Sequence, residues 1–474
     1  MGEEARRFAT ALGDAGQGYW QMLPVGPTGY QDSPYQSPST FAGNPLLIDL
    51  EEIRSWGLLR PKEIEPLQDL PRDRVDFGRL IPEKRHLLAL AAMRFLRSQP
   101  GPEYELFRAT EWLDDYASFA ALKQAFDDRP WVSWPRGLAL RDGATLDRAQ
   151  RRLAGRIEVE ATIQYFFQLQ WDRLRRFGES VGVELIGDLP IFVAHDSADV
   201  WSRPDLFHLD SDGRPTLVAG VPPDYFSTSG QRWGNPLYRW EVHEGEQYQW
   251  WSKRLGAAFD RFGLLRIDHF RGFSAYWEIP ASEQTAVNGR WVEGPGADLF
   301  RHLASDRQLP IIAEDLGIIT REVTALRRQF GFPGMRVAQF GFDSEADTSL
   351  HHPHNYPNDV VAYTGTHDND TTVGWFWGKN EKRDRRRLTK ERRRLLEIVG
   401  TRGDEIQWDL IDLVFSSRAD TAIAPVQDLL GLGAEARMNT PGKEEGNWTW
   451  RMPNPPPDEV IERLSRVTER NARR

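Results

Sequence analysis

Short apolar runs alternate with amphipathic stretches along most of this chain. Residues 5–15 place apolar and charged side chains at helical spacing, and the apolar run at residues 19–25 ends at Gly26 and Pro27. This order predicts a helix and then a strand. Similar runs recur, and the strands predicted in this way are residues 19–25, 183–193, 264–267, 309–313, 335–342, 360–363 and 421–426. Strands that alternate with helices predict parallel pairing.

The segment between the first two predicted strands is mostly helical. Residues 87–96, 104–126 and 146–177 carry apolar side chains three and four positions apart. We therefore expect a helical insertion subdomain over residues 60–178. A second insertion, rich in loops, is expected over residues 194–260, between the second and third predicted strands.

Polar groups follow several of the apolar runs and help to choose between two folds. A doubly wound sheet and a closed (β/α)8 barrel both fit the alternation, but a barrel gathers its active site at the C-terminal ends of its strands. The groups that follow strands are Asp188, Asp268 with His269, Glu314 with Asp315, Thr366 to Asp368, and Asp428. The predicted fold class is therefore α/β, a (β/α)8 TIM barrel forming one domain over residues 1–474.

Composition and charge narrow the function classes. The chain has 474 residues, of which 40% are apolar and 11% aromatic, enough for a large core. A net charge of −10 disfavours binding to nucleic acid or to anionic membranes, and no stretch reaches the length of a membrane span. There is no cysteine, which excludes disulfides, thiolate metal sites and cysteine nucleophiles. With an acidic N-terminus, these features predict a cytoplasmic protein without nucleic-acid or membrane partners.

Three other motifs are better explained by structure than by chemistry. Residues 178–182 match Gly-x-Ser-x-Gly, but they follow a helix and precede a strand, the reverse of the order a nucleophile elbow needs. His351, His352 and His354 lie among prolines, without a register that aims them at one metal ion. Residues 379–394 mix acidic with basic side chains, as a solvated helix face does. No nucleotide-binding pattern occurs, so a nucleotide cofactor is not expected. The carboxylate chemistry described next requires neither a metal nor an organic cofactor, so we expect neither.

Carboxylates at the ends of strands are the strongest chemical signal. Strand alternation puts Arg266 and Asp268 on one face, where the cation can keep the carboxylate ionised, as a nucleophile requires. Glu314 follows an apolar run, and an apolar setting raises a carboxyl pKa, as a general acid requires. Retaining glycosidases use such a pair about 5–5.5 Å apart. His367 and Asp368 follow a third strand, although each of these groups could instead be structural.

Aromatic residues in glycine- and proline-rich loops supply candidate sugar platforms. Such rings can stack on the apolar faces of sugars, although many loop aromatics only fill surface gaps. We expect three of them, Tyr225, Phe226 and Trp233, to form a lid that excludes water. The full set of candidates is Tyr30, Tyr35, Tyr225, Phe226 and Trp233.

Several longer segments together resemble a known family. They are residues 29–36, 42–45, 187–201, 266–272, 312–317, 365–369 and 439–442. The family that they resemble is the amylomaltases, which are the 4-α-glucanotransferases, or disproportionating enzymes, of glycoside hydrolase family 77 in the α-amylase clan. The segments occur in family order and span nearly the whole chain.

The resemblance implies a function and roles for individual residues. It implies transfer of an α-1,4-glucan segment to the 4-hydroxyl of a glucose or maltooligosaccharide acceptor, without a cofactor. Donors would include maltooligosaccharides, amylose and glycogen. Asp268 would be the nucleophile that forms a β-glucosyl-enzyme, Glu314 the acid/base and Asp368 the transition-state stabiliser. Substrate contacts are implied for Asp188, Arg266, His367, Asp224, Gln231, Trp233 and Asn235, and further ones for Ser33, Tyr35, Asp343 and Asn439.

Two alternatives compete with the transferase. An α-amylase-type hydrolase would use the same carboxylates but let water take the glycosyl group. Only about 48 residues follow Val426, so we expect no C-terminal β-sandwich of the kind α-amylases carry, which favours transfer. A non-catalytic glucan-binding protein would not need all three carboxylates.

The strand count leaves the predicted barrel one strand short. Seven strands are predicted, whereas a closed barrel needs eight, and the chain opens with a helix that no strand precedes. Family members have a first strand and a His-Pro-Thr-Ser-Leu-Pro-like motif before the segment that residues 2–20 resemble. We therefore expect that the first barrel strand, in about 25 N-terminal residues, is missing from this chain, leaving two strands with unpaired edges.

Overall fold

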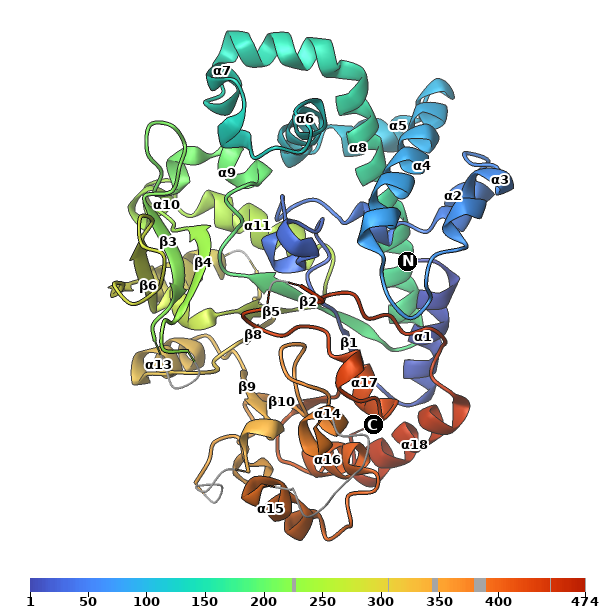
Figure 1. Cartoon of the computed structure of the whole chain (residues 1–474), viewed down its shortest axis with the longest axis vertical. Coiled ribbons are helices and arrows are strands. Elements are labelled where there is room, and N and C mark those ends of the chain that lie inside the picture. The colour runs from blue at the N-terminus through green and yellow to red at the C-terminus, as the bar shows by residue number, and fades with distance from the viewer. Residues whose placement is uncertain (224–226, 306, 343–347, 379–388, 444, 474) are drawn as a thin grey trace.

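A computed structural model describes residues 1–223, 227–305, 307–342, 348–378, 389–443 and 445–473. All seven predicted strands are present, and they pair in parallel in two sheets (Figure 1). The first sheet has the order β1 (Tyr19–Gln21), β2 (Glu184–Pro190), β5 (Leu264–Asp268) and β8 (Ile311–Ala313). The second has the order β11 (Thr421–Ile423), β10 (Val360–Tyr363) and β9 (Gly334–Val337).

A backbone hydrogen bond connects the two sheets. Ala313 N, at the end of β8, donates to Pro333 O, just before β9, at 2.9 Å. The strands therefore follow one another from β1 to β11, and each of these two end strands has one strand partner in the described residues. A cavity of about 730 Å³ lies between them and is lined by Trp20 and Ala422, among others. The hydrogen-bonded order does not close into a ring, and the described residues hold no eighth parallel strand.

Helices cover the parallel strands. Helix α1 precedes β1 and contacts α18. Leu464 of α18 belongs to the same core cluster as Ala15, which follows α1. Gln17 ties these two helices together, because its side-chain amide donates to Thr468 Oγ1 at 2.8 Å. The covering helices are α1 (Glu3–Asp14), α11 (Gln249–Phe259), α12 (Gly296–Leu303), α13 (Arg321–Gln329), α14 (Thr372–Trp377), α15 (Lys390–Val399), α16 (Ile406–Phe415), α17 (Val426–Leu429) and α18 (Asp458–Arg470).

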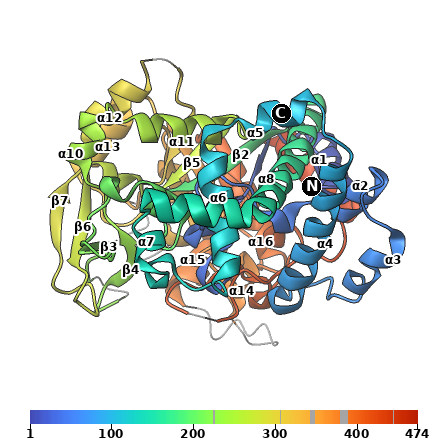
Figure 2. The ribbon, with the colours of Figure 1, turned by 90° about the horizontal axis from the view of Figure 1, so that it is seen from above.

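The predicted helical segment between the first two strands is helical in the structure. It lies above the sheet in Figure 1, and Figure 2 shows α6 and α8 crossing its outer surface. Asp142 begins the longest helix, α8, by accepting a hydrogen bond from Thr145 N at 3.0 Å. The helices of this segment are α2 (Leu50–Ser55), α3 (Pro61–Ile64), α4 (Phe77–Arg97), α5 (Pro102–Arg108), α6 (Glu111–Ala125), α7 (Arg136–Ala139) and α8 (Gly143–Ser180).

An antiparallel sheet lies where only loops and helices were expected. Its order is β4 (Gln231–Pro236), β3 (Leu217–Val221), β6 (Ala275–Pro280) and β7 (Arg290–Glu293). The short helix α9 (Ala198–Ser202) precedes β3, and the short helix α10 (Trp240–Gly245) follows β4. Sequence patterning missed this sheet because Gly220, Gly234 and Pro236 interrupt β3 and β4, and because β3 pairs with a strand about 60 residues away.

Five predicted strands are shorter than expected. One of them, β8, begins two residues late, at Ile311, and the other four end early. The run at residues 19–25 ends as a strand at Gln21. The run at residues 183–193 ends as a strand at Pro190, and the run at residues 335–342 turns into a 3-10 helix at Ala338. The run at residues 421–426 ends as a strand at Ile423. Where a strand ends early, the apolar side chains continue into the turn that leaves the sheet, so hydrophobicity alone overestimates the strand. None of the described helices is long and apolar enough to cross a membrane.

Candidate active site

Arg266 is the centre of a buried ion cluster at the ends of β2 and β5. Asp188 lies opposite Arg266 in the parallel register, and Arg266 Nη1 contacts its two carboxylate oxygens at 2.8 and 2.6 Å. Arg266 Nη2 donates to Asp268 Oδ1 at 2.7 Å, so the pair expected from strand alternation is present. Because Arg266 is only 4% exposed and Asp188 only 6%, the bonds between them are shielded from water, which strengthens them.

Tyr35 joins this cluster from the loop after β1. Its hydroxyl donates to Asp188 Oδ2 at 2.6 Å. Ser33 holds the loop in shape, since its hydroxyl accepts a hydrogen bond from Tyr35 N at 3.2 Å. Ser33 therefore has a structural partner in addition to any sugar contact, whereas Tyr30, in the same loop, is 73% exposed.

Asp268 faces a large cavity with one oxygen uncommitted. Its side chain is 32% exposed, and Oδ2 makes no hydrogen bond to the part of the chain that the structure describes. The cavity has a volume of about 1150 Å³ and is lined by both Asp268 and Asp368. Asp268 is thus aimed through one oxygen and free at the other, as a nucleophile should be.

Glu314 lies in a different environment from Asp268. Burial raises the pKa of Glu314 from 4.5 to about 7, with the negative charge of Asp268 adding to the rise. The positive charge of Arg266 and two backbone amides oppose that rise in pKa. These amides are His269 N and Leu316 N, each 2.7 Å from a carboxylate oxygen. A carboxyl with a pKa near 7 can both give and take a proton at neutral pH.

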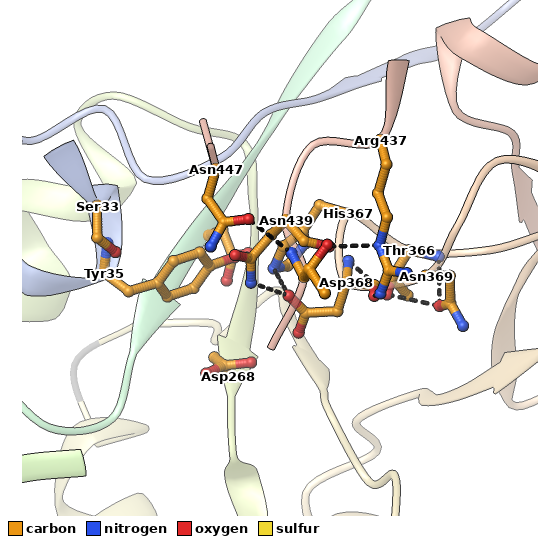
Figure 3. A network of polar contacts seen from close by, with 12 residues as sticks. Ser33, Tyr35, Asp268, Thr366, His367, Asp368, Asn369, Arg437, Asn439 and Asn447 are labelled. Atoms are coloured by element: carbon orange, nitrogen blue, oxygen red, sulfur yellow. Dashed lines mark hydrogen bonds and ion pairs between the residues drawn. The ribbon is translucent and has the colours of Figure 1, made fainter. Parts of the chain in front are cut away.

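Asp368 is held by a network of polar contacts (Figure 3). Its Oδ1 accepts a hydrogen bond from Asn439 Nδ2 at 2.6 Å and lies 3.3 Å from His367 Nε2. Arg437 Nη2 donates to the backbone carbonyl of Asp368 at 2.6 Å. The structure therefore brings the predicted residues His367, Asp368 and Asn439 together, on the same cavity as Asp268.

Two residues of this site were missed by sequence reasoning. Arg437 contacts Asp368, and the Trp448 ring lies 5.7 Å from the Tyr35 ring and 5.9 Å from the His367 ring. The Tyr35 and His367 rings are themselves stacked at 5.2 Å. The sequence signal for both was their place beside the family segment at residues 439–442.

Strand β4 contributes Trp233, which lines the cavity, and Asn235, which connects loops. The Trp233 ring packs edge-on against His269 at 4.8 Å, and its Nε1 donates to Gln231 Oε1 at 3.1 Å. Asn235 is buried and engaged at both ends, because it donates to Val193 O and accepts from Gln36. Trp233 can meet a sugar directly, whereas Asn235 mainly holds the loops that line the cavity.

Some predicted residues lie outside the described part of the chain. These are Asp224, Tyr225, Phe226 and Asp343. The predicted histidine loop is structured, since His351 Nδ1 accepts a hydrogen bond from Val337 N at 3.2 Å. No group of three or more acidic or histidine side chains that could hold a metal ion occurs among the described residues.

Comparisons with known proteins identify the family of the chain. The model of the 4-alpha-glucanotransferase family matches residues 1–456. A 4-alpha-glucanotransferase of Thermus thermophilus is 50% identical over 463 residues, which cover 95% of this chain and 91% of that protein. A chloroplastic/amyloplastic 4-alpha-glucanotransferase of Arabidopsis thaliana is 41% identical, over 96% of this chain and 78% of that protein.

A solved structure has the same fold. The amylomaltase from Streptococcus agalactiae, in complex with acarbose, superposes with a TM-score of 0.94 at 35% identity, over 100% of this chain and 95% of that one. The fold is therefore that of an amylomaltase. The chain belongs to the 4-alpha-glucanotransferase family, as its sequence segments predicted.

Proposed function

We propose that this protein transfers a segment of an α-1,4-glucan to the 4-hydroxyl of an acceptor glucose or maltooligosaccharide. Family membership supports this activity. The observation that carries the chemistry is the contrast between two carboxyls. Asp268 is paired with the Arg266 guanidinium at 2.7 Å, whereas Glu314 is buried and has a pKa raised to about 7. A nucleophile and an acid/base need this difference in environment.

In the proposed first step, the free oxygen of Asp268 attacks the anomeric carbon of the donor. The bond between that carbon and the glycosidic oxygen breaks, and Glu314 donates its proton to the leaving oxygen. Arg266 keeps Asp268 ionised and in place for the attack. Asp368, fixed by Asn439 and His367, stabilises the positive charge that develops on the sugar.

In the second step, the ionised Glu314 takes the proton from the acceptor 4-hydroxyl. The acceptor oxygen then displaces Asp268 from the anomeric carbon, so the α configuration is retained. The amides of His269 and Leu316 stabilise the ionised form of Glu314, and burial stabilises the protonated form. This balance lets one group serve in both steps.

The proposal also gives the two insertions a role in forming the cleft, and it gives the protein a cellular location. The helical insertion at residues 60–178 and the loop subdomain at residues 194–260 border the cleft, and residues from both line the cavity that holds Asp268. The proposal keeps four substrate contacts that lie outside the described residues, Asp224, Tyr225, Phe226 and Asp343. A cytoplasmic location rests on the cysteine-free sequence, which suits a reducing compartment.

Product analysis with maltotriose tests the proposed activity. Transfer should yield glucose and a ladder of maltooligosaccharides longer than the substrate. Hydrolysis, the alternative, would accumulate glucose and maltose without longer chains. That second result would overturn the transferase and favour an α-amylase-type enzyme, because both reactions share the glycosyl-enzyme and differ only in the group that resolves it.

A further inference from the structure

The turn between β6 and β7, residues 281–289, is tied to the rest of the antiparallel sheet through one buried residue. This residue is Ala286, which is 0% exposed. Its backbone carbonyl accepts a hydrogen bond from Trp277 Nε1 at 2.9 Å, and its amide donates to Ser229 O at 3.0 Å. The turn therefore anchors the segment just before β4, the strand that brings Trp233 to the cavity.

An asparagine followed by a glycine lies at the end of this turn. Asn288 is exposed, and Gly289 comes directly after it. The backbone nitrogen of a residue can attack the side-chain amide of a preceding asparagine, and glycine allows the closest approach because it has no side chain. Gly289 N is weakly held, since its hydrogen bond to Ala286 O is 3.3 Å long. The two reacting groups are thus adjacent, and the asparagine amide is open to water.

Trp277 explains why a glycine occupies position 289. A Cβ atom on Gly289 would lie 2.2 Å from Trp277 Nε1 and 2.9 Å from Glu278 O, which is too close for any side chain. The Trp277 ring cannot move aside without losing its hydrogen bond to Ala286 O. The packing of the turn therefore requires, after Asn288, the residue that leaves its amide most reactive.

We propose that Asn288 is a site of spontaneous deamidation. Gly289 N attacks Asn288 Cγ and loses its proton, and the side-chain nitrogen leaves as ammonia. Water then opens the resulting succinimide at either carbonyl, which gives aspartate or isoaspartate at position 288. Overall, the amide and one water become a carboxylate and an ammonium ion, so the reaction needs no oxidant, reductant or enzyme. This inference does not depend on the proposed transfer activity.

The new carboxylate weakens the turn because of the residue that Asn288 contacts. Asn288 Nδ2 donates a hydrogen bond to Glu283 Oε2 at 2.9 Å. Deamidation replaces this donor with a second carboxylate, so an attraction becomes a repulsion between like charges. Isoaspartate also adds a carbon atom to the backbone of the turn. Because Ala286 holds Ser229, the modification should loosen the start of β4 as well.

Peptide mapping of protein aged at mildly alkaline pH tests the site. Mass spectrometry follows the replacement of NH2 by OH in each asparagine, and isoaspartyl methyltransferase labels the isoaspartate product. Asn355 is the matched control, because it is also exposed and its Nδ2 also donates a hydrogen bond of 2.9 Å, to Ser349 O, but Tyr356 follows it. We expect Asn288 to lose its amide while Asn355 keeps it. In the Asn288→Gln protein the attack would have to close a larger ring, so the amide at position 288 should persist. If Asn288 keeps its amide, or loses it no faster than Asn355, the proposal is overturned.

A permanent carboxylate tests the structural consequence separately. Asn288→Asp should speed the hydrogen exchange of amides in residues 281–289 by about threefold, the size of one exposed charge pair. Adding Glu283→Gln removes the second carboxylate and should return the exchange to the wild-type rate. If Asn288→Asp exchanges as slowly as the wild type, or if Glu283→Gln gives no recovery, the repulsion with Glu283 does not loosen the turn and that part of the proposal is wrong.

Discussion

Arg266→Lys is the substitution that probes the proposed centre most sharply. One guanidinium bridges Asp188 and Asp268 with contacts of 2.6 and 2.7 Å, and it is almost fully buried. Lysine keeps the positive charge but has no planar fork that can reach two carboxylates at once. We expect the ammonium to keep its contact with one carboxylate and lose the other.

The size of the effect follows from the lost contact. A hydrogen bond to a charged group contributes about 1.5–3 kcal/mol. If the bond to Asp268 is lost and its full value is felt in the transition state, kcat falls by about 10- to 200-fold. Arg266→Met also removes the charge and leaves two carboxylates unpaired, so it should cost about 3–5 kcal/mol of stability as well.

Two measurements check these values. Glucose release from maltotriose at saturating substrate gives kcat, and thermal unfolding compares the stability of the variants. The reasoning is refuted if Arg266→Lys retains wild-type kcat. It is also refuted if Arg266→Met unfolds at the same temperature as Arg266→Lys, because the buried carboxylates would then not need the charge.

Three further predictions follow from the same site. Because the pKa of Glu314 is raised to about 7, kcat/KM should fall as pH rises through 7 and the acid form is lost. Its proton also favours the folded state, so this contribution to stability is full below pH 4.5 and lost as pH rises through 7. Glu314→Gln should abolish both effects, and pH profiles of rate and melting temperature that match those of the wild type would count against the assignment. Tyr35→Phe removes the 2.6 Å bond to Asp188 and should lower kcat/KM by about tenfold or more, whereas an unchanged value would make that contact incidental. Phe226→Ala, in the lid expected from the sequence, should shift products from longer chains towards hydrolysis, and an unchanged product ratio in chromatography would exclude Phe226 from that role.

The sequence predicts the parallel strands well because their side chains follow a local rule. Runs such as residues 360–363 are buried throughout, so every position is apolar. The pairing of Arg266 with Asp268 follows from the period of two along a strand. Both features depend on neighbours in the chain, and both are present in the structure.

Other features depend on contacts between residues far apart in the chain, which local sequence patterns do not predict. Trp448 reaches Tyr35 across more than 400 residues of chain, and β3 pairs with β6 only after two intervening helices. His269 adopts a left-handed conformation, with φ of 54°, and its amide contacts Glu314 from there. Such a conformation is uncommon outside glycine, so sequence patterning does not predict it. The apolar run before Glu314 predicts that burial raises its pKa, but the amide of His269 that opposes this rise is visible only in the folded chain.

Trapping of the covalent intermediate tests the central claim most directly. The Glu314→Gln protein should be incubated with α-maltosyl fluoride, whose fluoride leaves without protonation, and then digested for mass spectrometry. Without a base for the second step, the glycosyl-enzyme should accumulate. The account predicts a maltosyl group on the peptide that contains Asp268, at that carboxylate. A maltosyl group on another residue, or turnover of the fluoride without any adduct, would contradict the assignment of Asp268 as the nucleophile.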